Sequence, residues 1–120
     1  MTDPFKPGVW RPPAATGLAC LAYTMYDLTS CRVLELTGEC DISTFDELER
    51  ALTSSLSDSP GEVVVDLTHV TFIDAHCVGL LISAGATSMS VVGASGIVSR
   101  VLDMLDPSKQ KLRRGRPLRT

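Results

Sequence analysis

Several features that would point to a membrane protein or a nucleotide cradle are missing from this chain of 120 residues. No apolar stretch approaches the roughly 20 residues that a membrane-spanning helix needs. The first residues, 1–6, lack the charged-then-apolar layout of a signal peptide. The one glycine-containing run before an expected helix, 93–96, is too short a pattern for a phosphate cradle. We therefore expect a cytoplasmic protein without a membrane partner.

The cysteines and histidines do not form a metal-binding pattern. There is no CxxC pair, and the two histidines do not complete a zinc motif. In a reducing cytosol, buried thiols usually serve as small apolar side chains. We expect no metal and no cofactor, and we interpret the four cysteines first as packing residues: Cys20, Cys31, Cys40 and Cys77.

The net charge of −3 conceals an uneven distribution. Residues 107–120 hold six basic and no acidic side chains, which gives +6, and residues 1–106 hold five basic and fourteen acidic ones, which gives −9. An acidic body does not favour nucleic-acid binding. The basic tail is expected to be a solvated, disordered end, with contact to an acidic partner or to its own domain as the alternatives.

The length and the 44% hydrophobic content suit one domain with its own core. Residues 1–17 contain four prolines and are expected to form a disordered arm. Residues 18–26 and 31–37 are expected to form an antiparallel hairpin across a short turn. The chain thus divides into an arm (1–17), a folded domain (18–106) and a tail (107–120).

Helices and strands alternate after the hairpin. Thr44 and Glu47 form a capping-box pattern at the start of a first helix. The strand of residues 89–92 and a helix capped by Ser95 and stopped by Pro107 complete the domain, and five residues of this helix should face inward: Ile97, Val98, Val101, Leu102 and Leu105. This order predicts parallel strands joined by right-handed crossovers.

The central stretch runs from residue 61 to residue 84. Residues 63–67 are expected to form a buried strand, and residues 68–71 a short polar crossing. Asp74 then occupies the N-cap position of a helix that ends at Ala84. Residues 38–42 and 72–77 follow neighbouring strands, so they should lie together at the carboxyl ends, where α/β domains usually carry function. We call these two segments the strand-end surface.

The same segments resemble a known family. Val63–Leu67, Val70–Asp74 and Val78–Leu81 are similar to the signature of bacterial anti-sigma-factor antagonist (STAS) domains, and Leu36–Ile42 is similar to the family's Gly-Glu-Leu-Asp segment. The resemblance extends over residues 18–106. It implies an α/β fold: a small mixed sheet of about four strands, with an N-terminal hairpin and parallel strands, packed with about three helices.

The resemblance also implies a function without catalysis. Such domains bind an ATP-binding, kinase-type anti-sigma factor and free a sigma factor, for instance in a stress response. The implied partner-binding residues are Glu39, Asp41, Asp74, Ala75, His76, Cys77 and Val78. In the family, a hydroxyl shortly after the Asp is phosphorylated by the partner, and the added charge breaks the complex. His76 occupies that position here, so the serine phosphoswitch is missing. A monomer or weak dimer is expected.

His76 has three interpretations. It is a tolerated exposed residue, a pH- or ligand-sensing group at a helix N-terminus, or a phosphohistidine. Thr68 and Thr71 are alternative phosphate acceptors near the same loop.

The alternative function is a ligand- or redox-sensing module of the same fold. Cys77 lies in the first helical turn, where the helix dipole favours a thiolate, and Cys40 lies on the neighbouring loop. We hypothesise that these two thiols form a regulatory disulfide. An enzyme is not expected: capping explains Asp41 and Asp74, and Asp74, His76 and Cys77 on one helical turn point in different directions. Asp66, inside a strand run, is expected to bind backbone amides.

Overall fold

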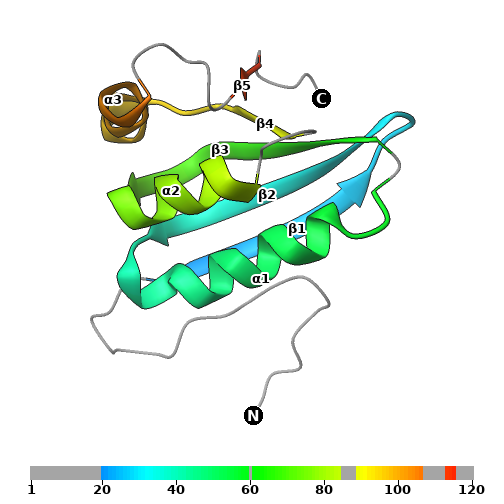
Figure 1. Ribbon diagram of the computed structural model, residues 1–120, viewed down its shortest axis with the longest axis horizontal. Helices are drawn as coiled ribbons and strands as arrows, with labels where there is room; N and C mark the ends of the chain where they lie inside the picture. The colour runs from blue at the N-terminus through cyan, green and yellow to red at the C-terminus, as the bar shows by residue number, and fades with distance from the viewer. Residues whose placement is uncertain (1–19, 60, 85–88, 107–112, 116–120) are drawn as a thin grey trace.

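A five-stranded mixed sheet forms the framework of the domain. The computed structural model describes residues 20–59, 61–84, 89–106 and 113–115. The strand order is β1-β2-β3-β4-β5, with β1 antiparallel to β2 and the other neighbours parallel (Figure 1). The strands are β1 (Leu21–Asp27), β2 (Cys31–Cys40), β3 (Glu62–Ile73), β4 (Met89–Val92) and β5 (Arg113–Arg114).

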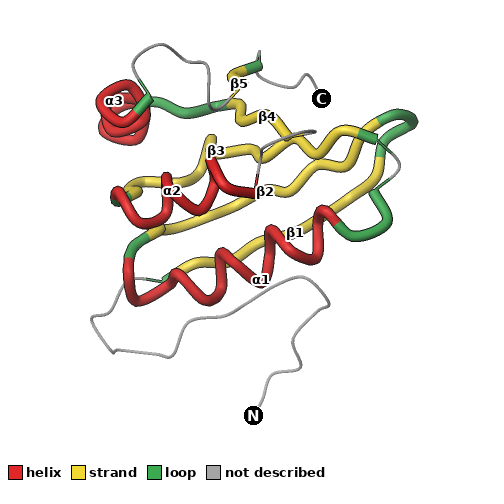
Figure 2. The backbone as a smooth tube through the Cα atoms, in the orientation of Figure 1, coloured by secondary structure: helices red, strands yellow, loops and turns green. Residues whose placement is uncertain are grey.

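The helices connect the parallel strands. A short 3-10 helix, η1 (Ile42–Thr44), leads directly into α1 (Phe45–Leu56), and α2 (Ala75–Ala84) and α3 (Gly96–Leu105) follow β3 and β4. Figure 2 shows α1 and α2 over the same face of the sheet, whereas α3 lies farther along the sheet, against β3 and next to α2. No helix in the described part of the chain has the length and apolar character to span a membrane.

The predicted α/β fold with an N-terminal hairpin and three main helices is confirmed, and a fifth strand extends it. Strand β5 lies in the segment that the sequence assigned to a disordered tail, and it pairs with β4. Arg113 also forms an ion pair with Glu62, and Arg114 with Asp103. These two arginines thus contact their own domain. The predicted arm and residues 107–112 and 116–120 lie outside the described residues.

Strand β3 is longer than the sequence predicted. Residues 68–71 are not a crossing but continue the strand, because β2 extends to Cys40 and supplies a pairing edge along their whole length. Register shifts in this pairing change the alternation, so that Leu67, Val70 and Ile73 are buried at every third position. The longer strands bring Cys40 and Ile73 side by side at their carboxyl ends.

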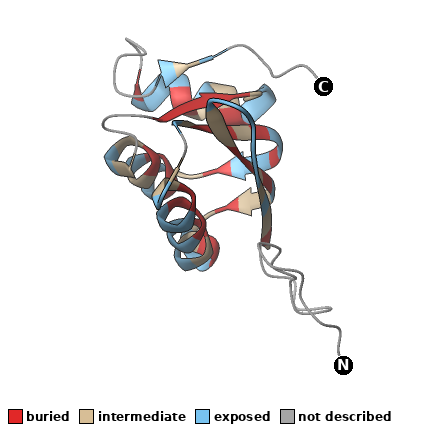
Figure 3. Ribbon diagram, turned by 90° about the vertical axis from the view of Figure 1, so that its right-hand side faces the viewer, coloured by how far each residue is buried: buried red, intermediate tan, exposed pale blue. Residues whose placement is uncertain are grey.

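The core lies between the sheet and the helices. Alternate residues of β2 and β3, such as Leu34 and Val65, pack with Leu48 and Leu52 of α1 and Leu81 of α2. Figure 3 shows the buried residues between the strands and the helices. Burial of each such side chain stabilises the fold by about 1.5–3 kcal/mol.

Helix α3 contributes fewer buried side chains to the core than the sequence predicted. Val98 and Leu102 are buried, but Ile97 and Leu105 are 51% and 39% exposed, so the prediction that both face inward is wrong. The reason is that, within the described part of the chain, the main contacts of α3 are with β3 and α2. The positions of two predicted caps are right, yet neither side chain makes the cap bond. Thr44 instead donates to the Glu39 carbonyl at 2.8 Å, while Ser95 has no side-chain cap bond.

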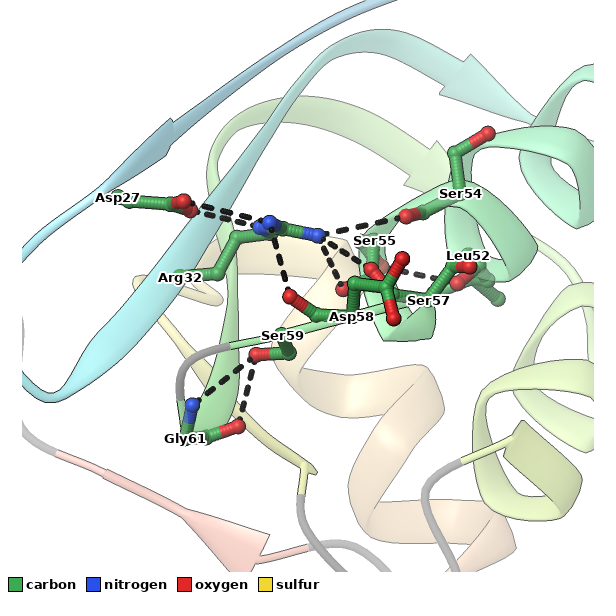
Figure 4. Close-up of polar contacts among 9 residues, drawn as sticks. All are labelled: Asp27, Arg32, Leu52, Ser54, Ser55, Ser57, Asp58, Ser59 and Gly61. Atoms are coloured by element: carbon green, nitrogen blue, oxygen red, sulfur yellow. Dashed lines mark hydrogen bonds and ion pairs between the residues drawn. The ribbon is translucent and has the colours of Figure 1, made fainter.

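An arginine joins the hairpin to the end of α1 (Figure 4). Arg32 donates to both carboxylate oxygens of Asp27, at 2.6 and 3.2 Å. Its Nη1 atom donates to the carbonyls of Ser55 and Ser57 at 3.2 and 2.8 Å. These carbonyls lie at the C-terminus of α1, where helices leave acceptors unpaired. The hydrogen bond from Arg32 holds the pKa of Asp27 below its ordinary value.

This pair predicts a pH-dependent contribution to stability. A lowered folded pKa stabilises the protein above the ordinary aspartate pKa and loses that effect as pH falls through the folded value. Asp27→Asn should therefore lower the urea midpoint at pH 7, and the difference from wild type should shrink at the lowest pH that still permits folding. Asp58→Asn is the comparison and should have a smaller effect, since Asp58 bonds Arg32 through its carbonyl and its carboxylate acts on Arg32 through charge alone. A difference that stays constant with pH would contradict the assignment.

Candidate functional site

The carboxyl ends of β2 and β3 meet, as the sequence predicts. The Asp74 amide donates to the Cys40 carbonyl at 3.0 Å. The Cys77 thiol lies 3.6 Å from the Asp41 carbonyl, which links α2 to the segment after β2. The two segments of the strand-end surface are therefore in direct contact.

Asp74 begins α2 in the way that the sequence indicates. Its Oδ1 atom accepts a hydrogen bond from the Cys77 amide at 3.0 Å, and its carbonyl accepts the Val78 amide at 3.0 Å. A side-chain acceptor at this position satisfies one of the free amides of the first helical turn. The carboxylate is half-buried, so part of it remains available at the surface.

Asp41 plays the same part at the neighbouring turn. Its Oδ1 atom accepts from the amide and the hydroxyl of Ser43 at 2.8 and 2.7 Å, and the Thr44 hydroxyl accepts from the Asp41 amide at 3.0 Å. These bonds form a capping box at η1, in place of the Thr44–Glu47 box that the sequence suggested. Both aspartates thus hold turns, which accounts for them without acid–base chemistry.

The expected partner-binding residues divide by exposure. Ala75 and His76 are exposed, and Glu39, Asp41 and Asp74 are half-buried. Cys77 and Val78 are buried in the core, so the prediction that they contact a partner needs correction. Cys77 and Val78 are the third and fourth residues after the cap at Asp74, and at helical spacing these positions point inward toward the sheet. These two side chains position α2 and do not form part of its outer face.

Two apolar residues lie within the predicted strand-end surface but were not among the expected partner-binding residues. Ile42 is 67% exposed and Phe72 is 38% exposed, although both side chains are large and hydrophobic. The sequence gave no signal that distinguishes the exposed Phe72 from the buried Ile73 beside it. Exposed aromatic and aliphatic side chains surrounded by polar residues are typical of protein-binding surfaces.

The two thiols at the site are free and buried. Burial raises the pKa of Cys40 to about 12, and the charges of Asp74 and Asp41 add to the effect. The pKa of Cys77 is also raised, first by burial, then by Cys40 and Asp74. The expectation that the helix dipole favours a thiolate at Cys77 is therefore wrong, because loss of hydration outweighs it.

Alkylation should show that Cys40 and Cys77 are unreactive in the folded protein. We expect iodoacetamide to modify neither Cys40 nor Cys77 in the folded protein at pH 8, and to modify both in denaturant, because only the thiolate reacts. Mass mapping with and without urea measures this. Cys20 and Cys31 are less buried and provide an internal comparison. Rapid modification of Cys77 in the native state would contradict the burial argument and would support the hypothesis of a regulatory Cys40–Cys77 disulfide.

The remaining candidates make local contacts. Asp66 accepts from the Thr68 amide at 2.9 Å, as predicted, but it is half-exposed and not buried. Thr68 and Thr71 are exposed, and Thr71 donates to the Gly38 carbonyl at 3.3 Å. Within the described ranges, no group of three or more His, Cys, Asp or Glu side chains is arranged to hold a metal ion.

Comparison with known proteins agrees with this architecture. A family model described as "Mlab, STAS domain" matches residues 27–112. No curated protein matches the sequence. An anti-sigma factor antagonist from Mycobacterium paratuberculosis is similar at 25% identity, with a TM-score of 0.68 over 79% of this chain and 85% of that one.

A second solved structure shares the fold. It is the anti-sigma factor antagonist SpoIIAA in its unphosphorylated form, 17% identical, with a TM-score of 0.59 over 81% of this chain and 89% of that one. The family model covers most of the chain, including β2, the strand-end surface and all three main helices. This chain belongs to the STAS domain family.

Proposed function

We propose that this domain is an anti-sigma-factor antagonist that binds a kinase-type, ATP-binding anti-sigma factor in the cytoplasm and frees a sigma factor. The observation that carries the proposal is the strand-end surface, where exposed Ile42 and Phe72 lie with the acidic residues of two fixed turns. The similarity to an antagonist at 25% identity supports the same class of partner. The recognition would be non-covalent.

The first turn of α2 has no hydroxyl in this chain. Ala75, His76 and Cys77 follow Asp74, and none can accept phosphate from a serine kinase. Phosphorylation at such a position would add about −1.5 to −2 charges next to Asp74. Without that acceptor, we propose that the complex persists in the presence of Mg-ATP.

Binding to each kinase-type anti-sigma factor of the host tests the proposal. Size-exclusion chromatography with mass detection, with and without Mg-ATP, should show a complex that ATP does not dissolve. The same experiment on the free protein gives its oligomeric state. If no candidate partner forms a complex, the proposal fails. If ATP dissolves the complex, the assigned loss of the phosphoswitch is wrong.

Two substitutions separate the cap of α2 from the charge at the surface. Asp74→Asn keeps a good N-cap and removes the charge, whereas Asp74→Ala removes both. Only the alanine variant should lower the free energy of unfolding, by about 1 kcal/mol. Weaker binding by both variants would assign the carboxylate to partner contact, whereas weaker binding by alanine alone would assign it to positioning α2.

A further inference from the structure

The two edges of the sheet differ in how well they resist pairing with another strand. Figure 1 shows β5 and β1 at opposite edges. Strand β5 is two residues long and both are arginines, which makes it a short, charged edge of the kind that prevents sheets from pairing. Strand β1 has seven residues, among which Asp27 carries the one charge, and it contains no lysine, proline or register shift. Among the described strands, β1 therefore offers the long, unprotected edge.

About half of the backbone groups of β1 point away from β2. The Glu39 amide donates to the Cys20 carbonyl at 2.8 Å, and the register from there to the hairpin turn is unbroken. In an antiparallel pair, alternate residues direct both N–H and C=O toward the neighbouring strand. The even-numbered residues of β1 thus bind β2, and the odd-numbered ones direct these groups to the open edge: Leu21, Tyr23, Met25 and Asp27. No described strand lies on that side of β1.

This edge is complementary to a second copy of itself. When two β1 strands run antiparallel about a twofold axis, pairing of all seven residues places Thr24 on the axis, opposite Thr24 of the second copy. Tyr23 then lies opposite Met25 of the second copy, and Leu21 opposite Asp27 of the second copy. These are pairs of odd-numbered residues, so the free N–H and C=O groups of the two strands meet and can exchange hydrogen bonds. No like charges face each other in this register.

The side chains along the edge favour the same occupant. Tyr23 and Met25 are partly buried against the core, and a methionine sulfur beside an aromatic ring is a favourable contact. The carboxylate of Asp27 is paired with Arg32 at 2.6 Å, which reduces its repulsion of a second copy. Residues 1–13 are a poorer occupant, because four of them are prolines, which cannot donate a hydrogen bond to a strand.

We propose that the chain forms a symmetric dimer in which two β1 strands pair edge to edge and join the two sheets into one. One strand from each copy makes a small interface, so the association is weak, with a Kd of about 0.1 mM. The dimer does not depend on the proposed anti-sigma partner, because no residue of β1 belongs to the strand-end surface. Failure of either proposal would therefore leave the other standing.

Sedimentation equilibrium of the full chain, at concentrations on both sides of this Kd, tests the proposal. The wild type should shift from the mass of one chain to that of two as its concentration rises. Thr24→Glu and Thr24→Lys each bring like charges face to face across the axis, and each should weaken association in low-salt buffer. The loss should reach about tenfold or more for Thr24→Glu, because Glu35 already lies beside Thr24 in the same copy, at 3.2 Å. An equimolar mixture of the two variants should dimerise again, because lysine then faces glutamate.

Thr37→Lys is the matched control. Thr37 is exposed on the same face of the sheet as Thr24, but it lies in β2, one strand in from the edge, so this variant should associate like the wild type. Thr24 is also exposed, so circular dichroism should show all three variants folded. Met25→Pro is a second probe, since it removes an N–H from the open edge and no hydrogen bond to β2, and it should also weaken association.

Three results would each overturn the dimer. A wild type that stays monomeric at about ten times the expected Kd would leave the edge to another occupant. Equal association of wild type, Thr24→Glu and Thr24→Lys would place the contact elsewhere on the molecule. A mixture of the two variants that associates no more tightly than its components would show that the two copies do not meet at Thr24.

Discussion

Replacing Gly38 with alanine is expected to lower the free energy of unfolding by about 3 kcal/mol or more. Gly38 has φ +120, which side-chain-bearing residues rarely adopt, and a Cβ there would lie 2.2 Å from the Cys20 carbonyl oxygen. That oxygen cannot retreat without loss of its hydrogen bond from the Glu39 amide, at 2.8 Å. The strain and the clash therefore add.

Gly79→Ala is the matched control. Gly79 lies inside α2, and an added Cβ meets no atom within 4 Å. This variant should gain about 0.5–1 kcal/mol, because alanine is the better helix former. Urea unfolding followed by circular dichroism measures both. A cost below about 1 kcal/mol at Gly38 would mean that β1 does not approach β2 as closely as the structure shows.

The local patterns of the sequence predict the centre of the fold well. The apolar run from Val63, the cap at Asp74 and the apolar spacing of α2 each depend on neighbouring residues, and each is found in the structure. The contact between the two segments of the strand-end surface was also predictable, because parallel strands joined by helices end at one edge. These features need no knowledge of distant contacts.

The features that the sequence did not reveal depend on distant contacts. Strand β5 consists of two arginines, and it forms beside β4 with Glu62 and Asp103 in reach. The continuation of β3 through residues 68–71 requires the length of β2. The exposure of Ile97 follows from the small part of the α3 surface that β3 and α2 cover.

Burial also raises the pKa of the Cys77 thiol, although its place at a helix N-terminus predicts a lowered one. A cysteine in the first turn of a helix is often activated, but Cys77 is buried in the same core cluster as Cys40, and burial raises its pKa. The same packing removes Cys77 and Val78 from the outer face of α2. Ile42 and Phe72 are thus the large hydrophobic residues of the strand-end surface that stay exposed.

If the proposed partner is correct, Ile42→Asp and Phe72→Ser should each weaken binding of the anti-sigma factor by about 30-fold or more, which corresponds to about 2 kcal/mol. Large apolar side chains at the centre of an interface dominate affinity, whereas the acidic residues around them mainly set specificity and association rate. Ile42 is 67% exposed, so Ile42→Asp should melt like the wild type, whereas Phe72 is 38% exposed and Phe72→Ser should lower the melting temperature somewhat.

Met104→Ser provides the matched comparison, because Met104 is 73% exposed on α3, outside the strand-end surface. Titration calorimetry should show unchanged affinity for this variant. If Ile42 and Phe72 can both be replaced without loss while a complex still forms, the partner binds elsewhere. The next surface to test would then be the groove between α1 and α2, which has a volume of about 490 Å³ and is lined by Leu52, Leu56 and Leu80. Since Asp74 lies at the start of α2, loss of binding in Asp74→Ala with Ile42 and Phe72 tolerated would favour that groove.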